Sequence, residues 1–222
     1  MTQLKTGKSD HDGGPAEEVP DGANPFRVSA FMHRLARVIF WLTGWKTEGV
    51  VPWPPRFVLI AAPHTSNWDA VVMLTAAYIF RIKMSWFVKQ EAFVFPLSSI
   101  IRFFGGVPID RGSRQNVVGQ AVACFRNSER LILAVPPEAT RKRSNFWKTG
   151  FYHIARNAGV PIVLGFLDYR RKVAGLGPAL TPTGDITVDF QVFAEFYAHI
   201  TPKFPELRGV VAVDPAALVR RG

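Results

Sequence analysis

The chain of 222 residues is poor in cysteine and has no long hydrophobic run. Its single cysteine, Cys124, excludes an internal disulfide and leaves too few thiols for a cysteine-rich zinc site or an iron–sulfur cluster. Because nothing requires an oxidising compartment, we expect a protein of the cytosol or facing it. The best uncharged apolar runs, residues 70–80 and 92–101, are shorter than the 18 or so residues that cross a bilayer, so the sequence predicts no transmembrane helix.

Acidic residues are also scarce, with 17 Asp and Glu against 27 Lys and Arg and a formal net charge of +10. Five of the acidic residues lie in residues 1–25, which contain almost no large apolar side chain and therefore predict a disordered acidic tail. Residues 26–222 carry 25 basic and 12 acidic residues, a net charge of +13. Such a charge suits a polyanion, an anionic membrane or a phosphorylated substrate, and does not choose among them.

Residues 26–46 predict an amphipathic helix ahead of the main domain, residues 47–222. One interpretation is an interfacial helix with its apolar side at the acyl boundary and its basic side toward anionic headgroups. The other is a helix packed on the core, since any surface helix is amphipathic. Phe40 and Trp41, outside the main apolar stripe, favour the membrane. The stripe is Phe31, Leu35, Val38, Leu42 and Trp45, flanked by Met32 and Ile39, with His33, Arg34 and Arg37 around the other side.

After residue 55 short apolar runs alternate with longer helical patterns, which is typical of an α/β domain. We expect one domain with a mixed, mostly parallel sheet flanked by helices. Strands are expected at residues 57–61, 84–88, 107–110, 131–135, 160–166 and 186–190, and helices at residues 67–80, 95–104, 113–126 and 149–157.

The first predicted strand runs into the sequence Pro-His-Thr-Ser-Asn-Trp-Asp, residues 63–69, which places His64 and Asp69 in a strand-to-helix turn. In a continuous helix this spacing would put them about 140° apart, but a turn can bring them together. Asp69 could then orient the imidazole and leave its other nitrogen free as a general base for a substrate hydroxyl. Alternatively, Ser66 caps the helix, Asp69 completes a capping box, and His64 is incidental.

Two further segments place cations at turns. In residues 103–112 a glycine pair and a short strand end in Asp110 and Arg111, where the arginine could bind a phosphate or form only a surface turn. In residues 135–143 an apolar strand leads into Glu138, Thr140 and Arg141, with further basic residues beside them and Lys148 beyond. This loop is either a phosphate site or a solvated run of charge. Residues 158–164 predict a buried strand.

Taken in this order, the segments resemble the glycerophospholipid acyltransferase family, which includes bacterial 1-acylglycerol-3-phosphate acyltransferases, over about residues 57–166. The motifs are His64 and Asp69 separated by four residues; the glycine turn with Pro-Ile-Asp-Arg, here Gly106, Val107, Pro108, Ile109, Asp110 and Arg111; Pro-Glu-Gly-Thr-Arg, here Pro137, Glu138, Ala139, Thr140 and Arg141; and Val-Pro-Ile-Val, here Val160, Pro161, Ile162 and Val163. Ala139 replaces the glycine of the third motif, which narrows the backbone conformations open there.

The resemblance implies acyl transfer from acyl-CoA or acyl-carrier protein to a lysophospholipid or glycerol-phosphate hydroxyl, with His64 as the general base and Asp69 as its partner. It also implies that Arg111 holds the acceptor phosphate and that Glu138, Thr140, Arg141 and Lys148 build or bind around it. Residues 160–164 would support the site or an acyl pocket. No metal or cofactor is expected.

The resemblance, together with the +13 body, predicts a peripheral or monotopic protein at the cytoplasmic face of the cell membrane. Two other classes stay open. One is a thioesterase-like hydrolase that uses the same pair on water. The other is a basic lipid-binding or nucleic-acid-binding module without catalysis, although nucleic acid is not expected, because a basic chain without a base-reading element does not explain four ordered motifs.

Overall fold

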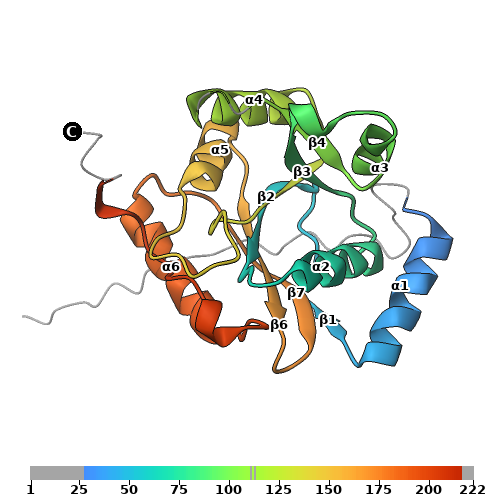
Figure 1. Ribbon diagram of the computed structural model, residues 1–222. Helices are drawn as coiled ribbons and strands as arrows, with labels where there is room; N and C mark the ends of the chain where they lie inside the picture. Colours follow the sequence, from blue (N-terminus) through green and yellow to red (C-terminus); the bar gives the residue numbers. More distant parts are fainter. Residues whose placement is uncertain (1–27, 111, 113, 217–222) are drawn as a thin grey trace, which may run out of the picture.

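The computed structural model describes residues 28–110, 112 and 114–216, so the predicted tail, residues 1–25, and Arg111 lie outside the described residues. The described part forms a seven-stranded sheet in the order β1-β7-β6-β2-β5-β3-β4 (Figure 1). Neighbouring strands are parallel except for the antiparallel pair β6 and β7. The strands are β1 Lys46–Glu48, β2 Arg56–Ala62, β3 Met84–Lys89, β4 Gly106–Ile109, β5 Leu131–Val135, β6 Ile162–Asp168 and β7 Val173–Leu180.

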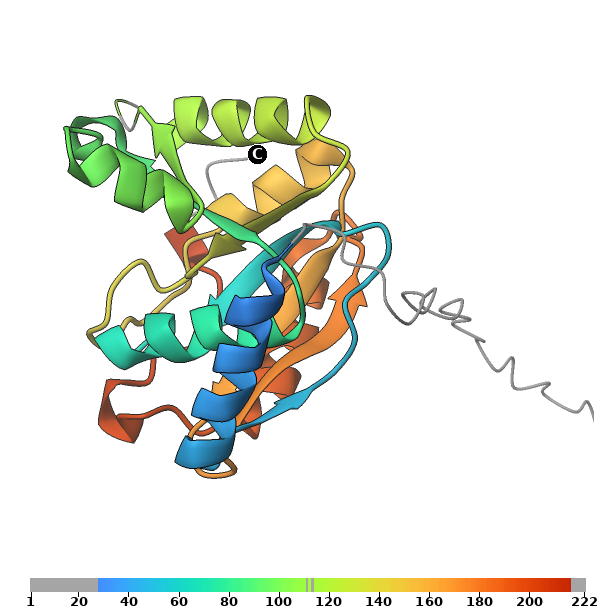
Figure 2. The same cartoon turned by 90° about the vertical axis from the view of Figure 1, so that its right-hand side faces the viewer.

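Helices cover both faces of the sheet, as Figures 1 and 2 show. Alternate residues of β2 divide the core: Phe57 and Leu59 pack on the side of α2, and Val58 and Ile60 on the side of α4, α5 and α6. The prediction of a mixed, mostly parallel sheet flanked by helices is confirmed. The helices are α1 Ala30–Thr43, α2 Asn67–Ile79, α3 Leu97–Phe103, α4 Arg114–Arg126, α5 Gly150–Ala158 and α6 Ile186–Ala198, with 3₁₀ turns η1 Gln90–Ala92 and η2 Pro205–Leu207.

The strand predicted at residues 186–190 is wrong, because this segment opens helix α6. The carboxylate of Asp185 accepts hydrogen bonds from the N–H groups of Thr187 and Val188 and caps the helix. Phe190, Phe193 and Tyr197 then recur at helical spacing and are buried in the core. The β-branched run Ile186-Thr187-Val188 gave the misleading strand signal.

Strands β1 and β7 were not predicted. Strand β7 has the sequence Val-Ala-Gly-Leu-Gly-Pro-Ala-Leu, whose glycines and proline are rare in strands. The structure explains Gly175 by close packing, since a Cβ there would lie 2.4 Å from the ring of Phe166. Strand β1 has only three residues, too few for a periodic signal.

Helix α1 confirms the predicted N-terminal helix and corrects two of its details. Phe40 is only 4% exposed and faces the protein, so it does not support the membrane interpretation. Trp45, predicted as part of the apolar stripe, lies just after the helix and packs against the ring of Phe40. Much of the stripe is open to solvent, with Phe31 71% and Leu42 69% exposed, and Trp41 beside it is 79% exposed. The described part of the chain contains no helix that is both long enough and apolar enough to span a membrane.

Strand β4 forms the edge of the sheet opposite β1, and within the described residues it pairs only with β3. The backbone N–H of Trp86 donates to the carbonyl of Gly105, and Pro108 aligns with Val88. Gly105 has φ +93° and a Cβ on it would lie 2.0 Å from the carbonyl oxygen of Met84. The turn predicted at the glycine pair therefore requires glycine at residue 105.

Candidate active site

The candidate site lies where β2, β5 and β6 end, at the carboxyl edge of the parallel strands, where α/β sheets commonly bind ligands. His64 follows β2, and Asp69 lies in the first turn of α2. The side chain of Ser66 caps α2, and Asp69 Oδ2 accepts hydrogen bonds from the N–H groups of Thr65 (2.7 Å) and Ser66 (2.8 Å). The predicted capping box is present.

The same turn brings His64 and Asp69 together, so the capping and pairing interpretations both hold. Nδ1 of His64 lies 3.5 Å from Oδ2 of Asp69, whose side chain is buried. Burial lowers the pKa of His64; Asp69 opposes this effect, and the positive charge of Arg141 adds to it. The lowered pKa favours a neutral imidazole at pH 7, and Nδ1 is the ring nitrogen that lies toward the carboxylate.

Glu138 supports the backbone of His64. Its side chain, 4% exposed, accepts a hydrogen bond of 2.7 Å from the His64 N–H through Oε2. Burial raises the pKa of Glu138 to about 7; Asp69 also raises it, while the His64 hydrogen bond and the charge of Arg208 lower it. The resemblance implies that Glu138 builds or binds around the acceptor phosphate, and in the structure its carboxylate holds the loop that carries His64.

The other residues of the third motif lie on an exposed loop after β5. Arg141 is exposed, and its charge reaches His64. Thr140 accepts a hydrogen bond from the N–H of Lys142. Lys148 is exposed, and its backbone N–H donates to the carbonyl of Pro137. Ala139 has φ +55°, so it keeps the left-handed conformation that glycine adopts more readily.

The second motif builds a turn between β4 and α4. Asp110 accepts a hydrogen bond from the N–H of Gly112 (2.8 Å) and one from the side-chain amide of Asn116 (3.2 Å). A Cβ on Gly106 would lie 2.2 Å from Cγ2 of Ile101, so the glycine allows α3 to approach β4. Arg111, the predicted phosphate ligand, lies outside the described residues.

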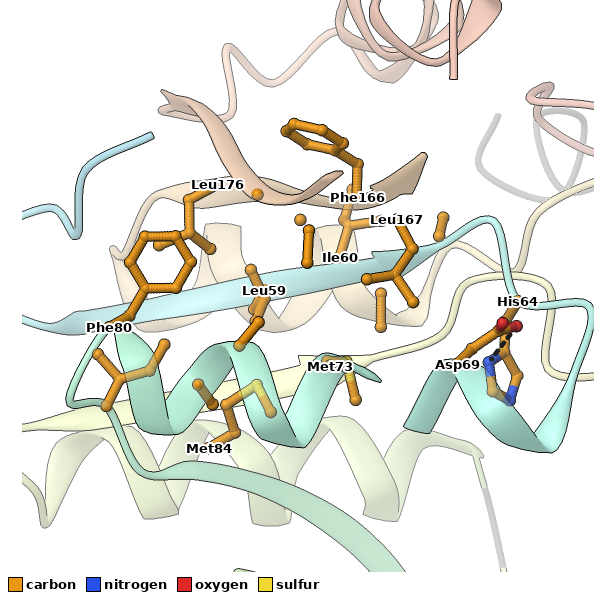
Figure 3. A pocket seen from close by; sticks show the side chains of 18 of the residues that line it. Leu59, Ile60, His64, Asp69, Met73, Phe80, Met84, Phe166, Leu167 and Leu176 are labelled. Atoms are coloured by element: carbon orange, nitrogen blue, oxygen red, sulfur yellow. Dashed lines mark ion pairs between the residues drawn. The ribbon is translucent and has the colours of Figure 1, made fainter. Parts of the chain in front are cut away.

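A narrow apolar pocket runs from the His64–Asp69 pair between α2 and the sheet (Figure 3). Its wall comes from β2, α2, β3, β6 and β7, and Figure 3 places Phe80, Met84 and Leu176 toward the end far from His64. In the fourth motif, Val160 and residues 162–164 are buried in the core, and Pro161 accepts a hydrogen bond from the N–H of Val58. The residues of β6 that line the pocket are 165–167.

Sequence reasoning missed the contribution of the last 55 residues to the site. Tyr169 donates a hydrogen bond of 2.7 Å from its hydroxyl to Oδ1 of Asp69. The N–H of Phe204 donates to Oγ1 of Thr65, and the Lys203 ammonium lies 5.4 Å from the ring centre of Trp68. Tyr169 lies 100 residues beyond Asp69, and Lys203 and Phe204 lie further along the chain, so local sequence patterns give no signal for these contacts.

Comparisons with known proteins agree with the fold and the motifs. The family model described as Acyltransferase matches residues 50–163. The 1-acyl-sn-glycerol-3-phosphate acyltransferase of Haemophilus influenzae is 28% identical over 150 residues, which cover 63% of this chain and 60% of that protein. The crystal structure of the 1-acyl-sn-glycerophosphate (LPA) acyltransferase PlsC from Thermotoga maritima matches with a TM-score of 0.51 and 18% identity, over 72% of this chain and 71% of that one.

Proposed function

Because the chain belongs to the acyltransferase family, we propose that it transfers a fatty acyl group from an acyl thioester to a hydroxyl of a lysophospholipid or glycerol phosphate. The observation that carries this proposal is the apolar pocket that opens on a neutral, carboxylate-paired histidine. A long apolar chain and a weakly acidic hydroxyl are the two reactants that such a site can serve.

His64 would act as the general base. The lipid hydroxyl gives its proton to Nε2 as its oxygen attacks the thioester carbonyl carbon, and Asp69 stabilises the imidazolium that forms. When the carbon–sulfur bond breaks, the imidazolium returns the proton to the thiolate. The products are an ester and a free thiol, and His64 is neutral again. Glu138 holds the His64 backbone through this cycle.

The pocket would hold the acyl chain. Its lining is almost wholly apolar except for His64 and Asp69, so a bound chain would place its carbonyl beside the base and its tail among residues such as Met73, Ala76 and Met84. Acyl-CoA and acyl-carrier protein carry the same thioester, and the two donors share this chemistry.

Cations near the site would bind substrate phosphates. Arg141 lies close enough to influence His64, and the resemblance of the second motif implies that Arg111 holds the acceptor phosphate. We further propose peripheral attachment to an anionic membrane at its cytoplasmic face. The exposed side chains of Phe31 and Trp41 on α1, with Arg34 and Arg37 exposed beside them, support it.

The test is acyl-CoA turnover by the purified full chain with and without a panel of lysolipid and glycerol-phosphate acceptors. We expect thiol release to require an acceptor and to be lost in His64→Ala, while circular dichroism shows an intact fold. Equal thiol release without acceptor would replace the proposal with a thioesterase. Full activity of His64→Ala would remove the base mechanism. Salt-sensitive DNA binding without turnover would instead favour the binding module.

A further inference from the structure

Asp69 is held from two sides by different parts of the chain. Its Oδ2 accepts the N–H groups of Thr65 and Ser66 and faces His64, whereas its Oδ1 accepts the hydroxyl of Tyr169 at 2.7 Å. Tyr169 follows β6 and lies 100 residues beyond Asp69 in the sequence. The local turn thus fixes one oxygen, and a distant strand end fixes the other.

Tyr169 is in turn held by the segment that ends helix α1. The ring of Trp45 packs edge-on against the ring of Tyr169, with 5.0 Å between centroids, and also packs against Phe40 at 6.0 Å. Helix α1 ends at Gly44, which has a φ of +75°. The backbone N–H of the next residue, Trp45, donates to the carbonyl of Phe40. A continuous chain of contacts therefore runs from α1 through Trp45 and Tyr169 to Asp69.

We infer that Tyr169 is a positioning residue for the His64–Asp69 pair, and that Trp45 holds Tyr169 in place. The packing of α1 against the domain thereby controls the geometry of the pair. The inference rests on the proposed function, because it concerns how that site is organised. Its physical basis is that a single rotation of Asp69 about its side-chain bonds would move Oδ2 away from His64, and the Tyr169 hydrogen bond opposes this rotation.

The surroundings of Tyr169 keep its hydroxyl protonated, as a hydrogen-bond donor to Asp69 must be. Burial raises the pKa of its hydroxyl, and the hydrogen bond to Asp69 raises it further, so Tyr169 stays protonated. The Lys203 ammonium lies 6.0 Å from the centre of its ring. The charged groups that act on the pair are Arg141, which affects His64, and Glu138, which affects Asp69 and is itself affected by Arg208.

The first experiment compares Tyr169→Phe with Tyr152→Phe. Tyr152 is a matched control, because its hydroxyl donates to Asp189 at 2.8 Å in the core, away from the pair. In Tyr169→Phe we expect kcat to fall roughly tenfold with KM changed little. The acid limb of kcat/KM should move to higher pH, because Asp69 loses a donor and its more localised charge favours the imidazolium. Tyr152→Phe should lower the thermal midpoint and leave kcat and the acid limb unchanged.

The second experiment tests the link to α1 with a double-mutant cycle. Trp45→Ala should lower kcat in the wild-type background and have little further effect in Tyr169→Phe, because Trp45 acts through Tyr169. Trp45→Phe, which keeps an aromatic edge, should stay near wild type and shows whether loss of folding explains Trp45→Ala. Additive effects of the two substitutions would overturn the role of Trp45.

His64→Ala separates this inference from the proposed function. If the wild type is active, His64→Ala is inactive, and Tyr169→Phe keeps the wild-type kcat and acid limb, then Tyr169 is structural only and the inference fails while the function stands. If His64→Ala is fully active, the base mechanism fails first, and the positioning role of Tyr169 falls with it.

Discussion

The carboxylate of Glu138 accepts a hydrogen bond of 2.7 Å from the backbone N–H of His64, 74 residues earlier in the chain. This contact ties the third motif to the first at the ends of adjacent strands β5 and β2. It also places a buried acid beside the proposed base. The free energy of unfolding should therefore depend on the titration of Glu138.

We predict that Glu138 makes the free energy of unfolding of the wild type decrease as the pH rises from 4.5 to 7. Its pKa is raised from 4.5 to about 7 in the folded state, so over this range the folded protein keeps a proton that the unfolded chain releases. Glu138→Gln removes this titration, and the stability of the variant relative to wild type should rise by roughly 3 kcal/mol over the same range. Urea denaturation at several pH values measures the difference, and parallel pH profiles for the two proteins would contradict the prediction.

Replacing Arg141 should change the pH dependence of activity. The charge of Arg141 lowers the pKa of His64, so Arg141→Gln should raise that pKa and move the acid limb of kcat/KM to higher pH. Lys142→Gln is the control, because it removes an exposed charge from the neighbouring residue. A limb that moves equally in both variants would assign the effect to net charge alone.

Ala139→Gly should stabilise the protein by up to about 1 kcal/mol. Ala139 has φ +55°, a conformation that costs an L-residue with a Cβ more than it costs glycine. Ala123→Gly in the exposed face of α4 should do the opposite, with a loss of about 1 kcal/mol, because its backbone is helical. Chemical denaturation of both variants tests the contrast, and a loss of stability in Ala139→Gly would refute it.

Filling the pocket should shorten the acyl chain that is accepted. Ala76 is buried on α2 and lines the pocket, whereas Ala70 is exposed on the same helix. We expect Ala76→Leu to lower kcat/KM for long-chain acyl-CoA at least tenfold while turnover of short-chain acyl-CoA is kept, and Ala70→Leu to change neither. Equal losses for both chain lengths would place the acyl chain elsewhere.

Exposed aromatic side chains on α1 should contribute to membrane binding. We expect the double variant Phe31→Ser and Trp41→Ser to bind anionic vesicles more than tenfold more weakly than wild type, because each side chain loses about 2 kcal/mol of apolar burial in lipid. Val192→Ser, on the exposed face of α6, is the control. Co-sedimentation of the double variant at the wild-type level would return α1 to a purely structural role.

Local patterns in the sequence predicted most of the sheet and the central pair. The apolar run of β2 and the helical pattern of α2 bracket His64 and Asp69, so the turn between them was predictable from short-range signals. The α6 segment was misjudged because β-branched residues favour strands locally, whereas its capping by Asp185 and its aromatic packing are decided by the tertiary fold.

The support of the site was beyond prediction because it depends on long-range contacts. Tyr169 reaches Asp69 only after β6 has paired with β2, and Trp45 reaches Tyr169 only when α1 packs against α2. Nothing in the spacing of these residues specifies the contacts. The direction of Glu138 toward the His64 backbone has the same origin.

Pro108 limits the pairing of strand β4 with a strand of a second molecule. Trp86 donates to Gly105, and so in this parallel pair residues 105, 107 and 109 face β3 while Pro108 faces outward from the open edge. Any other residue there would offer a backbone N–H to a strand from a second molecule. A proline of the Pro-Ile-Asp-Arg motif therefore also reduces edge-to-edge aggregation at the strand that leads into the second-motif turn.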